Sequence, residues 1–172
     1  IKAWALWWKG YAYSRIGSTY YAGIITNSSE NTNGNYVTNA AIIIEANATL
    51  DAAVLAANAA PSVGEFTGML ARIIPTHFQA DKGNPVTPAM LARNVNTLKA
   101  RNLLMNKPLS VMTAADWNAL LTLVNNGIQA GDNVFTIRTD AVGNLYTNGQ
   151  TLTGRTQSNT PGGSTYKLSE RW

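Results

Sequence analysis

Carboxylates and a single histidine are the side chains that could carry acid–base chemistry in this chain. The sequence contains nine Asp and Glu residues, one His and no Cys. Hydrolysis of a glycosidic bond needs two carboxyl groups that face each other across the sugar. Glu45 and Asp51 are on one expected helix at a spacing that does not bring them together, and Asp51 could meet Glu65 only through tertiary folding. A small cell-wall hydrolase built on these acids is therefore the third of three functional hypotheses.

His77 follows Pro75 and Thr76 in an expected loop. With no second His and no Cys in the chain, it lacks the partners of a metal site, and no carboxylate that would orient it as a general base can be identified. Phosphate-binding loops, dinucleotide-binding fingerprints, nucleophile elbows and calcium-binding loops are also missing from the sequence. We expect a protein that is not an enzyme and that has no catalytic residue, metal site or cofactor.

Uncharged polar residues dominate the hydrophilic part of the composition. Asp, Glu, Lys and Arg make up 13% of the chain, about half the usual share. Asn and Thr each occur 19 times and supply neutral hydrogen-bonding groups instead. The net charge of +4 is spread along the chain and forms no dense basic patch. We expect no nucleic-acid partner and no membrane span, and the composition suits an exposed component of a virion or extracellular assembly.

Aromatic residues near the start of the chain are the best binding candidates. Trp4, Trp7, Trp8 and Tyr20 could form the core of a small sheet, become buried between subunits, or stack on a sugar. The stretches 10–14 and 17–26 are rich in strand formers broken by Gly, so short strands are predicted within residues 1–37. Burial, within one chain or between chains, is favoured because these rings are strongly apolar.

The middle of the chain is predicted to be helical. Residues 38–60 are rich in Ala and end at Pro61, and a shorter helix is predicted over 64–74, ending at Pro75. Residues 79–87 have the composition of a connector, after which Thr87 and Pro88 supply a helix cap and a first helical residue.

The helix predicted over 88–105 has heptad spacing at Leu91, Val95, Leu98, Asn102 and Met105. Two interpretations remain open for this stripe. It packs against the core of its own chain, with Asn102 at the edge, or it forms a coiled coil between subunits in which Asn102 sets the register. The first is favoured because the stripe spans only two heptads.

The helix predicted over 112–128 begins with a Thr113 cap and Asp116. Its apolar face is predicted to pack in the core, Trp117 included; the face consists of Trp117, Leu120, Leu121, Val124 and Ile128.

From Asp132 the apolar period changes to two, which predicts a hairpin with turns at Gly143-Asn144 and Asn148-Gly149. The polar stretch that follows predicts an extended arm, and the terminal aromatic Trp172 is a candidate to dock on another subunit. The predicted class is α+β, with a helical middle between an aromatic-rich β segment and a C-terminal β-hairpin. The predicted units are 1–78, the connector 79–87, a helix pair plus hairpin over 88–149, and the arm 150–172.

The segment NVFTIRTDAVGNLYTNGQTLTG (133–154) resembles hairpins of bacteriophage tail-fibre and other virion appendage proteins, and TAADWN (113–118) is similar to pieces of phage structural proteins. The resemblance implies an oligomeric, often trimeric, virion component that contacts other virion proteins and a host surface. The chain departs from a fibre shaft, because it has no long heptad run and no tandem β-repeats.

The leading hypothesis is thus a non-enzymatic structural subunit that mediates attachment between subunits. Its interface candidates are Trp4, Trp7, Trp8, Tyr20, Leu91, Val95, Leu98, Asn102 and Trp172. The alternative is a carbohydrate-binding or adhesin module that uses the N-terminal aromatics and binds a host-surface glycan.

Overall fold

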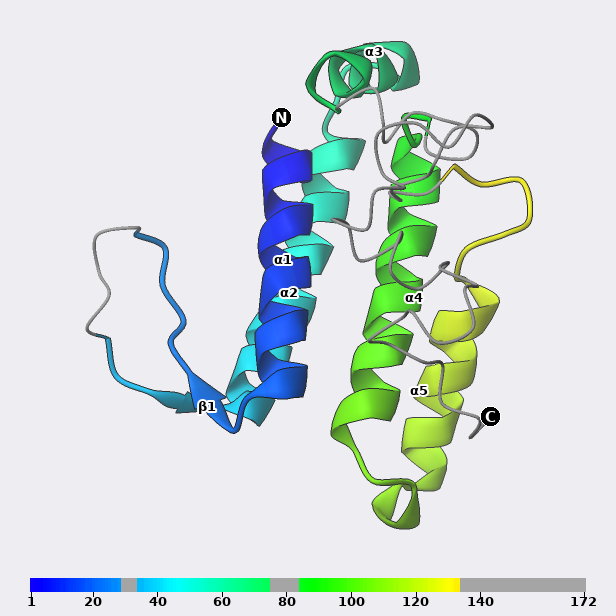
Figure 1. Ribbon diagram of the computed structural model, residues 1–172. Coiled ribbons are helices and arrows are strands. Elements are labelled where there is room, and N and C mark those ends of the chain that lie inside the picture. The colour runs from blue at the N-terminus through cyan, green and yellow to red at the C-terminus, as the bar shows by residue number, and fades with distance from the viewer. Residues whose placement is uncertain (29–33, 75–83, 134–172) are drawn as a thin grey trace, which may run out of the picture.

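The computed structural model describes residues 1–28, 34–74 and 84–133, which form a bundle of helices (Figure 1). Helices α1 and α2 lie side by side, α4 packs along them, and α5 lies on the outer side of α4. Helix α3 crosses the end of the bundle where the chain begins. In chain order the elements are α1 (Lys2–Thr19), β1 (Ala22–Gly23), β2 (Val37–Thr38), α2 (Asn39–Asn58), α3 (Val63–Ile73), α4 (Pro88–Asn106), the 3-10 helix η3 (Leu109–Val111) and α5 (Ala114–Asn125).

The α+β prediction is wrong, because the described residues are mostly helical. The strands expected across 1–37 are replaced by α1 over Lys2–Thr19. Among the described residues of this stretch, β structure is limited to the short antiparallel pair β1–β2, in which Ala22 faces Thr38 and Gly23 faces Val37. The aromatic residues and Gly10 disfavour a helix locally. Burial of one face of α1 against α2 and α4 outweighs that preference.

Small residues let α1 and α2 approach closely. Gly10 and Gly17 are buried on the α1 face toward α2. A Cβ added at Gly10 would lie 2.7 Å from Leu50 Cγ, and one at Gly17 would lie 2.8 Å from Ile43 Cδ1. The α2 side of this seam is lined by buried Ala46 and Leu50, both 0% exposed. The two helices are therefore held by dense apolar packing.

Three polar contacts, two of them buried and one part-buried, set the position of α4 against α1 and α2. The Trp7 indole Nε1 donates to Asn94 Oδ1 at 2.8 Å. Asn102 Nδ2 donates to Ser14 Oγ and to Asn47 Oδ1, each at 2.9 Å. Because a buried donor without a partner is costly, these contacts favour one register of the three helices.

The four helices predicted for the middle of the chain are confirmed as α2, α3, α4 and α5. Their N-caps are Thr38, Ser62, Thr87 and Thr113, whose side chains all accept a backbone N–H of the first turn. Pro88 stands at the start of α4, as predicted. The predicted hairpin and arm fall on residues 134–172, outside the described residues.

Helix α2 is long and apolar enough to cross a membrane by length and composition. It is also the central helix of this bundle, with seven buried residues that face α1 and α4. Its place in the bundle accounts for the apolar residues on its buried side, while Ile44 and Leu55 are each 71% exposed.

Candidate functional site

Helix α5 presents an apolar stripe to the outside of the bundle. The stripe, called the α5 stripe below, consists of Trp117, Leu121 and Val124 on the helix and Ile128 just after its end, which are 41%, 57%, 54% and 40% exposed. The sequence pattern predicts these side chains to lie in the core. Of the predicted apolar face only Leu120 is buried, at 8% exposure. The prediction of a core position for Trp117 and its neighbours is wrong, because α5 packs on α4 through a different face.

The face of α5 toward α4 is offset by one residue from the stripe. It comprises Asp116, Leu120, Leu123 and Gly127, which are buried or half-buried. A Cβ at Gly127 would lie 2.8 Å from Thr97 Oγ1 on α4, so glycine permits this close contact.

The first attachment of α5 to α4 centres on Asp116 and is called the Asp116 attachment. Lys107 Nζ, after the end of α4, lies 2.6 Å from Asp116 Oδ2. The backbone N–H and the hydroxyl of Thr113 donate to the same oxygen at 2.7 Å, which completes a capping box. The hydrogen bond from Lys107, followed by those from Thr113, holds the pKa of the Asp116 carboxyl far below its ordinary value. The start of α5 is thereby fixed by charge and hydrogen bonds.

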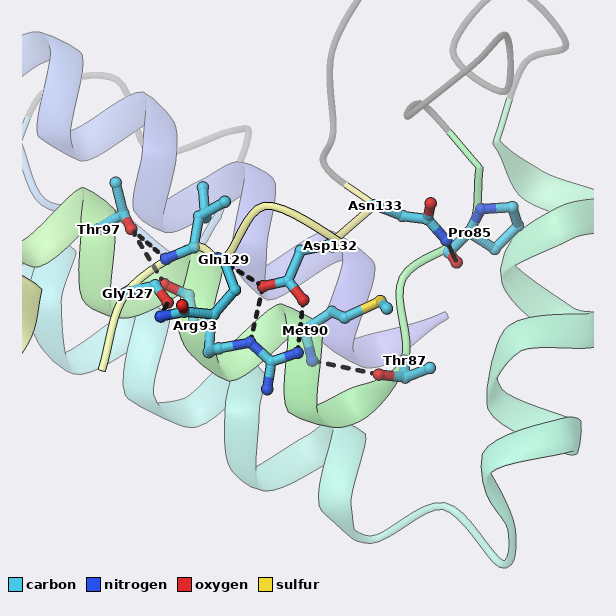
Figure 2. Close-up of polar contacts among 10 residues, drawn as sticks. Pro85, Thr87, Met90, Arg93, Thr97, Gly127, Gln129, Asp132 and Asn133 are labelled. Atoms are coloured by element: carbon cyan, nitrogen blue, oxygen red, sulfur yellow. Dashed lines mark hydrogen bonds and ion pairs between the residues drawn. The ribbon is translucent and has the colours of Figure 1, made fainter. Parts of the chain in front are cut away.

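The second attachment centres on Asp132, which comes after α5 in the sequence (Figure 2). Arg93 on α4 donates to both carboxylate oxygens of Asp132, from Nε at 2.7 Å and from Nη2 at 2.5 Å. The Asp132 side chain is 4% exposed, and its Oδ2 also accepts the Gln129 N–H at 3.0 Å. Bidentate contacts between arginine and a carboxylate fix orientation as well as distance.

Neutral hydrogen bonds extend this Asp132 attachment along α4. Asn96 Nδ2 donates to the Asn126 carbonyl at 2.9 Å, and the Ile128 N–H donates to Thr97 Oγ1 at 3.0 Å. Asn133 Nδ2 donates to the Pro85 carbonyl at 3.1 Å (Figure 2). Polar groups thus secure both ends of α5, while the side chains of the stripe stay 40–57% exposed.

The interface candidates on α4 lie inside this chain. Leu91 and Val95 are each 1% exposed and belong to the core cluster that also contains Trp7 and Leu50, with Leu98 packed against it. Asn102 is 1% exposed and bonded to α1 and α2. The structure supports the intrachain interpretation of this heptad stripe, because these side chains are covered within the bundle. Asn102 lies inside the bundle and not at its edge, and Met105 at the end of the stripe is 54% exposed.

The tryptophans near the start of the chain pack on one another. The Trp7 ring stacks on Trp4 at 6.2 Å and on Tyr11 at 5.5 Å between centroids, and the Trp8 ring meets Trp7 edge-on at 5.0 Å. Trp7 is buried, Trp4 is half-buried, and Trp8 is 37% exposed. Trp172, the remaining aromatic candidate, lies outside the described residues.

Tyr20 does not join that cluster, because it lies at the other end of α1, about 18 Å from Trp8 along the helix axis. It borders a hollow of about 490 Å³ between the end of α1, the start of α2 and the end of α4. Tyr21, Asn39 and Asn106 also line this hollow. The aromatic residues that were predicted to bind a sugar together therefore lie in two separate places.

The acids of the described residues do not form a catalytic pair. Asp51 pairs with Lys99 at 2.8 Å, and Asp116 and Asp132 are engaged in the two attachments of α5. Glu65 borders a second hollow, of about 650 Å³, where α1 begins and α3 packs, and no other acid lines it. Among the described residues no three His, Cys, Asp or Glu side chains lie close enough to hold a metal ion. His77 lies outside those residues.

Comparison with known proteins gives no relative to guide the assignment. No protein-family model, no curated protein and no solved structure matches the chain. The α5 stripe and its surroundings are therefore the basis for assigning a function.

The sequence carries a signal for the stripe in its double apolar pattern. Helix α5 has two apolar rows one residue apart, one containing Leu120 and Leu123 and the other containing Leu121 and Val124. Together they cover a wider arc than one packed face of a surface helix needs. The second row is the sign in the sequence that part of the apolar surface of α5 lies outside its packed face.

Proposed function

We propose that this chain is a non-enzymatic structural subunit of an assembly and that it attaches to neighbouring subunits through the α5 stripe. One observation carries the proposal. Three large apolar side chains of α5 (Trp117, Leu121 and Val124) and that of Ile128, just after the helix, are exposed beside a helix that polar contacts anchor at both ends. Exposed apolar patches of this kind typically mark interaction surfaces.

The surroundings of the stripe favour association. No residue from 117 to 131 carries a charge, and Asp116 at the start of α5 is neutralised by Lys107. A partner that covers the stripe therefore buries no unpaired charge, which would be the main energetic obstacle.

A virion or an extracellular particle is the setting that we propose for this assembly. Two features support it: the surface rich in Asn and Thr, and the resemblance of residues 113–118 and 133–154 to phage structural proteins. Neutral hydrogen bonds depend little on ionic strength, which suits a component exposed to changing media.

A charged substitution in the stripe tests the proposal. Leu121→Lys should weaken self-association or association with particle proteins by at least about tenfold, because a buried ammonium group must lose its hydration. Thr122→Lys is the matched control, since residue 122 is exposed on the adjacent polar face of the same helix. Sedimentation velocity at increasing concentration gives the measurement. If the full chain stays monomeric and binds no particle protein, or if both variants associate as the parent does, the proposal is wrong.

A carbohydrate-binding module is the second candidate, and the hollow beside Tyr20 favours it. Tyr20 and Tyr21 are 62% and 89% exposed, and Asn39 and Asn106 supply amide groups nearby. The hollow's volume lies within the range of small-ligand sites, and aromatic rings with neutral amides suit sugar recognition. A glycan array should give a signal that Tyr20→Ala removes and Trp8→Ala preserves. An array without signal would eliminate this candidate.

A further inference from the structure

We propose that the hollow of about 650 Å³ where α1 begins and α3 packs is a binding site for an apolar monocarboxylate, such as a medium-chain acyl acid. A site for a small molecule is separate from the attachment of subunits through α5. Three features of the hollow lead to this class of ligand: the small residues that leave it open, the apolar side chains that line it, and the cations beside them.

Small residues keep the hollow open. Helix α3 crosses the end of the α1–α2 pair (Figure 1), and the hollow is lined there by Ala3, Ala56, Ala60, Gly64 and Gly68. A Cβ added at Gly68 would meet no atom within 4 Å. The space that these residues leave lies within the volume range of small-ligand sites.

Side chains of the apolar core reach this hollow. Ala3 and Phe66 are buried, belong to the larger core cluster, and also line the hollow. Met69 lines it as well, and a flexible thioether side chain adapts to the shape of a neighbouring group. A hydrocarbon chain or an aromatic ring placed here removes apolar surface from water, which favours binding.

Two cations line the same hollow, and neither forms an ion pair with another described residue. They are Lys2 on α1 and Arg72 on α3. The ion pairs of the described residues use Arg93, Lys99 and Lys107 instead. Because a guanidinium group can donate two parallel hydrogen bonds to a carboxylate, Arg72 is suited to hold the head of an acid.

Glu65 limits the ligand to a single negative charge. Among the described residues it is the acid that lines the hollow, and it stands in the first turn of α3, near the positive end of the helix dipole. Together with Lys2 and Arg72 it leaves one positive charge in excess. A monoanion balances that charge, whereas an apolar ammonium ion is repelled and a neutral alcohol gains the apolar contact alone.

Isothermal titration of the full chain with octanoate, octanol and octylammonium tests the charge preference. Octanoate should saturate the site below about 1 mM and bind about threefold to fivefold more tightly than octanol, the gain typical of an exposed ion pair. Octylammonium should bind most weakly. Arg72→Gln should remove the preference for octanoate over octanol. Arg15→Gln is the matched control and should keep it, because Arg15 is an exposed residue of α1 that does not line the hollow.

Two further measurements locate the bound acid. Gly68→Leu places a side chain in the hollow and should abolish octanoate binding. Leucine favours a helix and no atom crowds its Cβ, so the variant should fold, which circular dichroism checks. In the parent chain octanoate should shift the NMR signal of the Met69 methyl group and leave that of Met105, which lines the other hollow, unchanged.

Three results would overturn the proposal. One is the absence of saturable octanoate binding below about 1 mM. Another is equal affinity for octanoate and octylammonium, or a preference for octanoate that Arg72→Gln leaves unchanged, since the cations would then not select the ligand. The third is binding that survives Gly68→Leu or leaves the Met69 signal in place, because the acid would then lie elsewhere. Attachment through the α5 stripe is tested separately by Leu121→Lys and stands or falls independently of these results.

Discussion

The α1–α2 pair and the α4–α5 pair of this bundle are held together in opposite ways. Between α1 and α2, Gly10 and Gly17 sit against Leu50 and Ile43, and the contact is dense and apolar. Between α4 and α5, ion pairs and hydrogen bonds at both ends carry much of the contact, while the larger apolar side chains of α5 point outward. The contact of the first pair is made by apolar packing, and that of the second relies on polar groups at its ends.

This difference indicates a division of roles. Apolar packing at the α1–α2 seam gives the bundle its stability, since buried apolar area is the main favourable term in folding. Polar attachments orient α5 without consuming its apolar stripe, which stays available to a neighbour. The predictions below test whether the two pairs differ in this way.

The largest effect is expected from shortening a side chain in the α1–α2 seam. Leu50→Ala should lower the free energy of unfolding by about 3 kcal/mol, because Leu50 is 0% exposed and its loss leaves a cavity. Leu55→Ala on the same helix should change it by less than about 0.5 kcal/mol, since Leu55 is 71% exposed. Urea denaturation measures both. Equal effects would show that the seam is not the stabilising region.

Glycine substitutions are expected to change the free energy of unfolding by smaller amounts, in opposite directions at two positions. Gly10→Ala should destabilise the protein by about 1 kcal/mol, because the crowding against Leu50 and the Ala46 carbonyl exceeds the gain in helix propensity. Gly68→Ala in α3 should stabilise it by about 0.5–1 kcal/mol, since nothing lies within 4 Å of the added methyl group. Thermal unfolding of the two variants gives the comparison. A gain at both positions would mean that α1 and α2 are less closely packed than described.

Low pH is expected to have the smallest effect on stability, and this effect should be confined to α5. The pKa of Asp116 is lowered in the folded state, so the attachment contributes stability above the unfolded value of about 3.9 and loses it as the pH falls further. The protection of amides at the start of α5 against hydrogen exchange, taken relative to the intrinsic rate at each pH, should therefore fall below about pH 4, while the middle of α2 stays protected. Asp116→Asn should show fast exchange at α5 already at neutral pH. Uniform loss of protection would contradict the proposed difference between the two pairs.

The sequence predicted the helices with clear caps and failed where tertiary packing decides. Thr87, Pro88 and Thr113 are local signals, and they placed the starts of α4 and α5 correctly. Helix α1 was missed because glycine and aromatic residues disfavour helix on their own, and only the contact with α2 explains Gly10 and Gly17. Local propensity does not contain that contact.

The sequence identified the residues of the candidate site but not the direction in which they face. The apolar spacing of α5 identified the residues of the stripe, but periodicity alone does not distinguish a core face from an interface. Asp132 and Arg93 are separated by 39 positions, and their pairing depends on how the chain turns after α5. Without that pairing, the direction in which α5 faces could not be deduced.

Protection of the stripe on association is the most direct test of the central claim. In a chain with Leu121→Cys as its only cysteine, the rate of maleimide labelling should be high in dilute solution and at least about tenfold lower at concentrations where the chain associates. The Thr122→Cys variant should label at one rate throughout. Equally fast labelling of the Leu121→Cys variant in dilute and associated samples would contradict the claim that α5 is the attachment surface.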